Sequence, residues 1–230
     1  MSARQSIFSN LPDKNIVCDS LINQAITFIW ESLIPWRENP DRIYVKGEEE
    51  LNGQFCVYLN LRAKEKMPMI CFHHEDRQKA QRRIDIGVKP SCSVIIHGCR
   101  YTFFQSILGI ECKRLPTPGT GRTREYVTGE DGKASGAIQR FKLGEHGHEH
   151  DVAIVVGYVQ KNNPKDWFST INSWILALSN DQPDIWNEHD LLKNMRCFDA
   201  GLRVKSFSKH SRLDGCKSNT IQLHHFWIKM

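Results

Sequence analysis

Two short segments decide the fold of this chain: RRIDIGV at residues 82–88 and LGIECKRL at residues 108–115. Apolar and polar residues alternate in both, and in a β-strand the side chains at positions i and i+2 share a face. Asp85 therefore lies opposite a face of isoleucine and valine, while Glu111 and Lys113 project together, opposite leucine, isoleucine and cysteine. If the two strands are neighbours in one sheet, the two carboxylates and the ammonium group meet at one site.

The rest of the chain predicts helices and further strands around these two segments. Apolar residues recur at helical spacing in residues 19–36, in residues 48–64 and in a stretch that begins at Asn163 or Pro164. A shorter helix is expected at residues 137–145. Strands are expected at residues 67–75, 82–88, 93–97, 101–113, 151–160 and 220–228, and an interruption of the strand at 101–113 stays open. A loop is expected at 115–136 and mostly irregular chain at 180–218. This order predicts an α/β or α+β fold around one central sheet.

Length and composition set broad limits. The chain has 230 residues, of which 40% are hydrophobic, and this predicts a single domain, residues 1–230, with a substantial core. The sequence has no run of about 18 apolar residues, so a membrane span is not expected. The opening MSARQSIFSNLPDKN lacks the apolar stretch of a secretory signal. The eight cysteines form no CxxC pair, which favours thiols in a reducing cytoplasm. The formal charge of +5 permits nucleic-acid binding without demanding it.

The three polar side chains of the deciding strands suit one kind of chemistry. Two hard carboxylates that lie close together bind Mg²⁺ or Mn²⁺ through oxygen. Such an ion stabilises negative charge on a phosphate and lowers the pKa of a bound water. A nearby lysine supplies a fixed positive charge or helps to orient that water. Asp85, Glu111 and Lys113 therefore indicate hydrolysis of a phosphodiester bond.

The pattern of Asp85 followed by Glu111-Cys112-Lys113 resembles the D…ExK motif of the PD-(D/E)XK, or restriction endonuclease-like, nuclease superfamily. The surrounding segments, IDIGV, IECKRLP, REYV, GAIQRF and GYVQ, are similar in their order to small bacterial members. One departure is that Ile84, rather than proline, precedes the aspartate. The resemblance implies an αβββαβ core over residues 48–160, with a central mixed sheet flanked by helices. Residues 1–47 and 161–230 would then be extra elements packed on that core.

The resemblance also implies a function and a set of site residues. The function is metal-dependent hydrolysis of DNA, in bacterial defence or DNA processing, with Mg²⁺ or Mn²⁺ as cofactor. Asp85, Glu111 and the main-chain carbonyl of Cys112 would bind the ion, and Lys113 would position or activate the water. Many members add a glutamate from the first helix. Glu48 is the candidate here, with Glu49, Glu50 and Glu31 as rivals.

Basic residues flank the expected site, and arginine suits the bidentate geometry of phosphate. The candidates for contact with nucleic acid are Arg114, Arg122, Arg124, Gln139 and Arg140, with Lys133 and Lys142 in the same basic group. Gln139 and Arg140 lie on the helix after the ExK strand, where similar nucleases carry polar groups that assist the site. DNA is a better expectation than RNA as partner, and a homodimer or a partner subunit of a defence system fits the same resemblance.

Three alternatives stay open at the level of sequence. Asp85, Glu111 and Lys113 could form a solvated salt bridge with no chemical role. The fold could serve as a nucleic-acid-binding or scaffold module without catalysis. Finally, the segment HGHEHD at residues 146–151 places histidines at alternate positions, His146, His148 and His150, which could converge on zinc together with His73 and His74.

Overall fold

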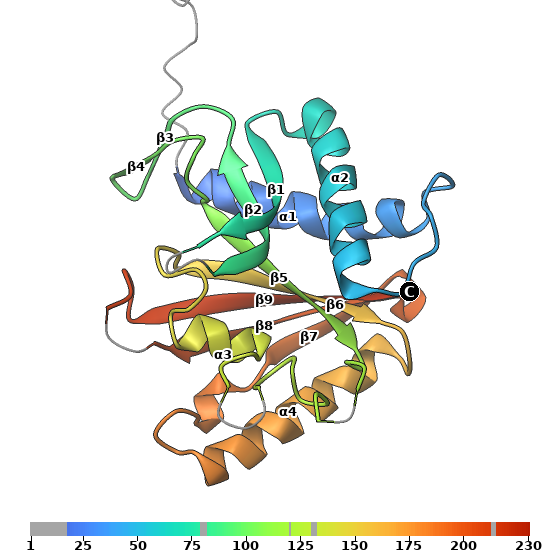
Figure 1. Ribbon diagram of the computed structural model, residues 1–230, viewed down its shortest axis with the longest axis vertical. Coiled ribbons are helices and arrows are strands. Elements are labelled where there is room, and N and C mark those ends of the chain that lie inside the picture. Colours follow the sequence, from blue (N-terminus) through green and yellow to red (C-terminus); the bar gives the residue numbers. More distant parts are fainter. Residues whose placement is uncertain (1–17, 79–81, 120, 130–132, 213–214) are drawn as a thin grey trace, which may run out of the picture.

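The computed structural model describes residues 18–78, 82–119, 121–129, 133–212 and 215–230 (Figure 1). Its centre is a seven-stranded sheet with the strand order β1-β2-β5-β6-β9-β8-β7. These strands are β1 (Ile70–Arg77), β2 (Arg83–Pro90), β5 (Leu108–Leu115), β6 (Val152–Val159), β7 (Lys193–Phe198), β8 (Arg203–Ser211) and β9 (Thr220–Lys229). A separate two-stranded sheet pairs β3 (Val94–Ile96) with β4 (Cys99–Tyr101).

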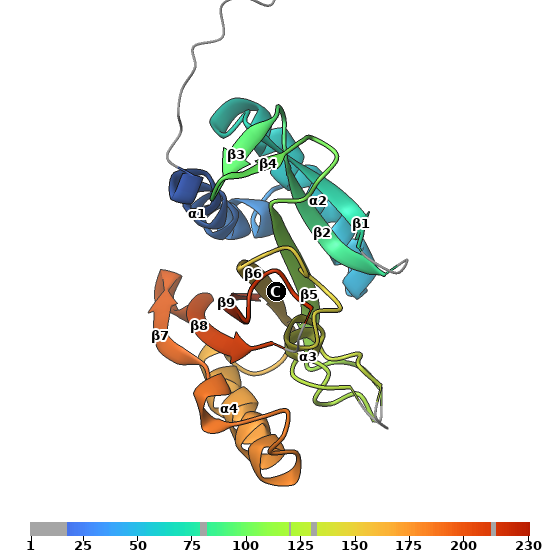
Figure 2. The ribbon, with the colours of Figure 1, turned by 90° about the vertical axis from the view of Figure 1, so that its left-hand side faces the viewer.

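Helices cover both faces of the large sheet, which makes three layers (Figures 1 and 2). The helices are α1 (Cys18–Arg37), α2 (Glu48–Lys66), α3 (Ala137–Lys142) and α4 (Pro164–Asp181), and two short 3₁₀ turns are η2 (Glu188–Asp190) and η3 (Asp199–Gly201). Helices α1 and α2 pack with Ile110, Cys112 and Phe226 in one core cluster. Helices α3 and α4 pack with Val155 and Trp227 in a second cluster on the opposite face. The α/β class and the central mixed sheet are therefore as expected.

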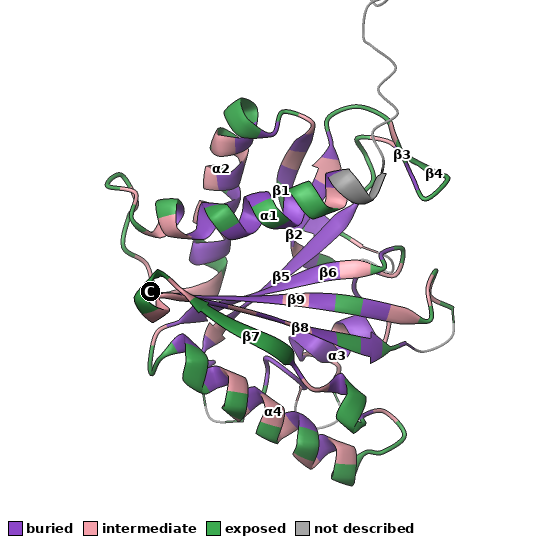
Figure 3. Cartoon of the chain, turned by 180° about the vertical axis from the view of Figure 1, so that it is seen from behind, coloured by how far each residue is buried: buried purple, intermediate pink, exposed green. Residues whose placement is uncertain are grey.

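Strand direction changes across the sheet. Strands β1, β2 and β5 pair antiparallel, β5 with β6 and β6 with β9 pair parallel, and β9, β8 and β7 pair antiparallel. Strand β6, with the sequence VAIVVGYV, is buried along nearly its whole length, as Figure 3 shows. A parallel strand that is covered on both faces needs such a continuous apolar run.

One expectation about the strands is wrong, and one that was left open is decided. Residues 180–218 were expected to be mostly irregular, but they contain β7 and β8. Strand β8 buries Ser206, Ser208 and His210 beside a single apolar residue, Val204. Its inward face is therefore mostly polar and lacks the apolar alternation by which a strand is recognised. The segment at residues 101–113, for which the sequence left an interruption open, is interrupted: β4 ends at Tyr101 and β5 begins at Leu108. The intervening turn exposes two phenylalanines, Phe103 and Phe104.

Two further observations concern the whole described chain. None of its helices is both long and apolar enough to cross a lipid bilayer. The cysteines with described side chains, from Cys56 to Cys216, are free thiols, and Cys56 and Cys112 are buried.

Candidate functional site

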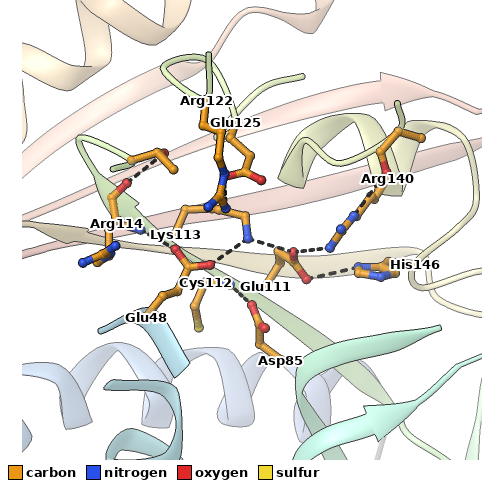
Figure 4. Close-up of polar contacts among 12 residues, drawn as sticks. Glu48, Asp85, Glu111, Cys112, Lys113, Arg114, Arg122, Glu125, Arg140 and His146 are labelled. Carbon is orange, nitrogen blue, oxygen red and sulfur yellow. Dashed lines mark hydrogen bonds and ion pairs between the residues drawn. The ribbon is translucent and has the colours of Figure 1, made fainter. Parts of the chain in front are cut away.

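Strands β2 and β5 are neighbours, as the deciding segments predict, and they bring Asp85 next to Glu111. Their described ladder runs from the Val88–Leu108 pair to the Ile86–Ile110 pair. One residue further along β2, Oδ2 of Asp85 accepts a hydrogen bond of 2.7 Å from the backbone N–H of Cys112 (Figure 4). Where the ladder stops, the half-buried carboxylate of Asp85 thus accepts the hydrogen bond of the Cys112 N–H in place of a backbone carbonyl of β2.

Glu111 lies in the middle of the cluster and is 1% exposed. Its Oε1 is 3.0 Å from Nη1 of Arg140 and 3.4 Å from Nζ of Lys113. Its Oε2 is 3.1 Å from Nδ1 of His146, although neither of these two atoms has a partner in hydrogen-bond geometry. Burial alone raises the pKa of Glu111, but Lys113, His146 and Arg140 oppose it and lower that pKa to about 2. Glu111 is therefore a carboxylate at neutral pH.

Lys113 joins this carboxylate to the first residue of α2. Its Nζ donates a hydrogen bond of 2.9 Å to Oε1 of Glu48, and Oε2 of Glu48 accepts one of 2.9 Å from the backbone N–H of Arg114. Burial lowers the pKa of Lys113, but Glu111, Glu48 and Asp85 outweigh that effect and raise it above its usual value. Lys113 therefore keeps its positive charge, and it is held between two carboxylates.

The structure distinguishes Glu48 from its rivals. Glu49 and Glu50 follow it on α2 and are exposed. Glu31 is exposed on α1, where its carbonyl oxygen accepts a hydrogen bond of 2.8 Å from Arg62. Arg62 lies about 21 Å along α2 from Glu48 at the usual helical rise. Glu31, which contacts Arg62, therefore lies near the opposite end of α2 from Glu48. Of these four glutamates, Glu48 is the one that bonds to the strand of Glu111 and Lys113, through Lys113 and the backbone N–H of Arg114.

The oxygen donors of this cluster suit a hard divalent cation. Burial, together with the negative charge of Glu111, raises the pKa of Asp85 well above its usual value. A cation between the two carboxylates would relieve that repulsion. Among the described residues, no group of three or more His, Cys, Asp and Glu side chains is arranged to hold a metal ion. Mg²⁺, however, commonly binds through one or two carboxylates and keeps several waters.

The arginines expected to contact nucleic acid have different environments. Arg114 donates a hydrogen bond of 2.8 Å from Nη1 to the carbonyl oxygen of Lys46. Arg122 pairs with Glu125 at 2.6 Å, and both Arg122 and Arg124 are exposed. These three arginines thus lie on or just after the strand that carries Glu111, and two of them face solvent.

Gln139 and the basic residues of α3 face inward instead. Oε1 of Gln139 accepts a hydrogen bond of 2.9 Å from the backbone N–H of Gly129, so this buried side chain holds the loop before α3. Arg140 pairs with Glu111, as described above. Lys142 is buried against Asp190 at 2.7 Å. Gln139 and Lys142 therefore serve the packing of α3, whereas Lys133 remains exposed.

The histidines at alternate positions have separate partners. Nδ1 of His148 lies 2.9 Å from Glu149, and Nε2 of His150 lies 2.9 Å from the carbonyl oxygen of Ser106. His146 instead contacts Glu111. The described histidines thus form no zinc site. The contact between His146 and Glu111 was not predicted, because the spacing of histidines in a turn carries no information about which distant strand the turn meets.

Comparisons with protein-family models, with curated proteins and with solved structures find no match.

Proposed function

We propose that this chain is a metal-dependent nuclease of the restriction endonuclease-like type that hydrolyses phosphodiester bonds in DNA. The observation that carries the proposal is the cluster in which Asp85, Glu111, Lys113 and Glu48 converge from β2, β5 and α2. The order of elements supports it as well. Helix α2, strands β1, β2 and β5, helix α3 and strand β6 follow one another as an αβββαβ core would, with β3 and β4 inserted before β5.

The donor set suits the expected cofactor. Asp85, Glu111 and the main-chain carbonyl of Cys112 would hold Mg²⁺ or Mn²⁺, with Glu48 close by. The bound ion would supply positive charge to a phosphate oxygen and lower the pKa of a water. Oε2 of Glu111, a buried carboxylate oxygen, lies 3.1 Å from Nδ1 of His146 without hydrogen-bond geometry, and this supports the assignment.

Lys113 acts in this proposal as a fixed cation. Its ammonium group is held at 2.9 Å from Glu48 and 3.4 Å from Glu111, so its position is defined before substrate binds. Because its pKa is raised by these carboxylates, it does not serve as a base at neutral pH. It orients the attacking water through hydrogen bonds and stabilises the negative charge that develops on the phosphate. Exposed Arg122 and Arg124 contact the phosphates on either side.

A non-catalytic nucleic-acid-binding or scaffold module is the second candidate. The observation in its favour is that Lys113 and Arg140 already neutralise Glu111 within the protein. In this alternative, the three side chains form a structural ion-pair network on the same fold. The two candidates differ in whether DNA is cleaved, not in whether it is bound.

The test is incubation of purified protein with plasmid DNA and Mg²⁺ or Mn²⁺. We compare the natural chain with Asp85→Asn and Lys113→Met, and with Lys209→Ala, an exposed lysine on β8, as control. Loss of one preorganised charge in a catalytic site typically costs about 10²–10³ in rate. We therefore expect a loss of that size in the two site variants and none in the control. Equal cleavage by all four proteins would contradict the assigned site.

A measurement of DNA binding, made beside the cleavage assay, distinguishes the scaffold alternative from the nuclease. If the natural chain binds DNA and cleaves none under any of these conditions, the scaffold alternative replaces the nuclease. In either case, log affinity should fall with log salt by about 0.9 for each phosphate contacted. Arg124→Ala should reduce the slope of log affinity against log salt by about 0.9, the contribution of one phosphate contact.

A further inference from the structure

A second site lies between α1 and the strands β7, β8 and β9. A groove of about 510 Å³ runs there, and the residues that shape it include Trp30 of α1, Arg196 of β7, Lys205 and Phe207 of β8 and Phe226 of β9. Figure 3 shows this side of the molecule, with α1 next to the sheet and the exposed strand β7 at its edge. The volume lies in the range of small-molecule sites in proteins.

The groove and the nuclease-like cluster lie on opposite faces of the sheet. The register pairs Glu111 with Val155 and Val155 with His225, so these side chains share a face. Phe226 follows His225 directly and therefore projects to the other face, where it packs in the same cluster as α1 and α2. Lys205 pairs with Phe226 and shares that face. The groove therefore does not belong to the candidate catalytic site.

Aromatic rings form its apolar floor and wall. Trp30 and Phe226 line the groove and are buried against each other, with ring centroids 5.2 Å apart. Phe207, which is half-buried, forms one side. The ring accessible to a flat, planar ligand is that of Phe207, and the packed pair of Trp30 and Phe226 supports it from below.

Positive charge lies beside these rings. Arg196 is exposed on β7, and Nζ of Lys205 lies 5.5 Å from the ring centroid of Trp30. The guanidinium of Arg203 lies 4.3 Å from the same ring, but it is paired with Asp199 and does not line the groove. No Asp or Glu occurs among the described residues that line the groove. The site therefore favours a ligand that combines an aromatic ring system with negative charge.

We propose that this groove binds a nucleoside phosphate. The base lies against the half-buried ring of Phe207, next to the packed rings of Trp30 and Phe226, and Arg196 and Lys205 hold the phosphate. The ligand can be a free mononucleotide or one nucleotide of a single strand, because both present an unpaired base and a phosphate. A duplex does not fit, because its bases are stacked and paired. The proposal goes beyond the catalytic proposal and stands without it.

The experiment measures binding by isothermal titration calorimetry with three probes: AMP, adenosine and a short single-stranded oligodeoxythymidine. The main variant is Arg196→Glu, because Arg196 is exposed and its replacement leaves the core intact. The matched control is Lys209→Glu, an exposed lysine on the same face of β8 that does not line the groove. Asp85→Asn is the control for the catalytic cluster.

We expect AMP to bind more tightly than adenosine, with affinity at least ten-fold weaker in Arg196→Glu and unchanged in Lys209→Glu and Asp85→Asn. Binding of the oligonucleotide alone, with the same dependence on Arg196, would identify the ligand as part of a strand. No binding of AMP or oligonucleotide to the natural chain, or binding that Arg196→Glu leaves unchanged, would overturn the proposal. A protein that binds AMP but cleaves no DNA would still support the groove proposal. The experiment therefore tests this proposal independently of the nuclease proposal.

Discussion

At the scale of single residues, the candidate site is defined by the alternation of opposite charges. Glu48, Lys113, Glu111 and Arg140 follow one another, each within 3.4 Å of the next. Charged groups are rarely buried unless they are paired, and removal of one partner leaves the other uncompensated. The position of each side chain therefore depends on its neighbours in the series.

Glu48 gives the sharpest prediction at this scale. Glu48→Gln removes the charge that holds Lys113 and the backbone N–H of Arg114. We expect DNA cleavage to slow by about ten-fold or more, since a charge-assisted hydrogen bond contributes about 1.5–3 kcal/mol. Glu49→Gln, at the exposed next position, should leave the rate unchanged. The measurement is the initial rate of plasmid cleavage, with circular dichroism to show that both variants fold. Equal rates in the two variants would remove Glu48 from the site.

At the scale of elements, the central strands approach one another closely where a glycine allows it. An added Cβ at Gly157 of β6 would lie 2.9 Å from a methyl carbon of Leu115 and even closer to the ring of Trp227. Trp227 cannot move aside freely, because its Nε1 donates a hydrogen bond of 2.9 Å to the buried hydroxyl of Tyr126. Gly157 thus sets how tightly β5, β6 and β9 pack beneath the second core cluster.

Two glycine substitutions should have opposite effects on stability. Gly157→Ala should lower the free energy of unfolding by about 1–3 kcal/mol, because it overpacks the core. Gly53→Ala, inside α2, should raise it by about 0.5–1 kcal/mol, because alanine is the better helix former and nothing lies within 4 Å of the new Cβ. Urea denaturation followed by circular dichroism checks both values. A neutral Gly157→Ala would contradict the close packing described here.

At the scale of the whole molecule, a chain of buried hydrogen bonds connects η2, the strands β8 and β9 and the loop before α3. Ser208 lies 2.6 Å from Nε2 of His210 and 2.8 Å from Nε2 of His225. Nδ1 of His210 lies 2.7 Å from Asp190, and Nδ1 of His225 lies 2.8 Å from the hydroxyl of Tyr126. Each bond in this chain has one donor and one acceptor if both histidines are neutral. A proton added to either ring would turn its acceptor nitrogen into a donor, so the hydroxyl of Ser208 or Tyr126 that faces it would lose its present acceptor.

The stability of the protein should therefore fall in mild acid. Burial lowers the pKa of both His210 and His225 in the folded state, whereas an unfolded histidine titrates near 6.5. The unfolded chain thus binds more protons below about pH 6.5, and folding stability is lost as the pH falls through this range, by up to about 1.4 kcal/mol per pH unit for each histidine. Urea denaturation at pH 7.5 and pH 5.5, at constant ionic strength, measures the change. Equal stability at both values would mean that the two rings are not held neutral.

The sequence by itself determined the alternating pattern of the two deciding strands, and hence that Glu111 and Lys113 share a face and that Asp85 comes next to them if the strands pair. It also determined α2, whose inward residues Leu51 and Phe55 are buried. These features follow from the local periods of strands and helices, which a linear sequence displays directly. The roles of these side chains in catalysis stay predictions.

Only the tertiary structure decided which glutamate joins them, that His146 reaches Glu111, and that residues 180–218 supply two strands of the sheet. Glu48 and Lys113 are 65 residues apart, and no periodicity relates positions so distant. Their contact depends on how α2 packs against β5. In the same way, β8 is held by buried hydrogen bonds among serines and histidines, which leave no apolar pattern in the sequence by which a strand could be recognised.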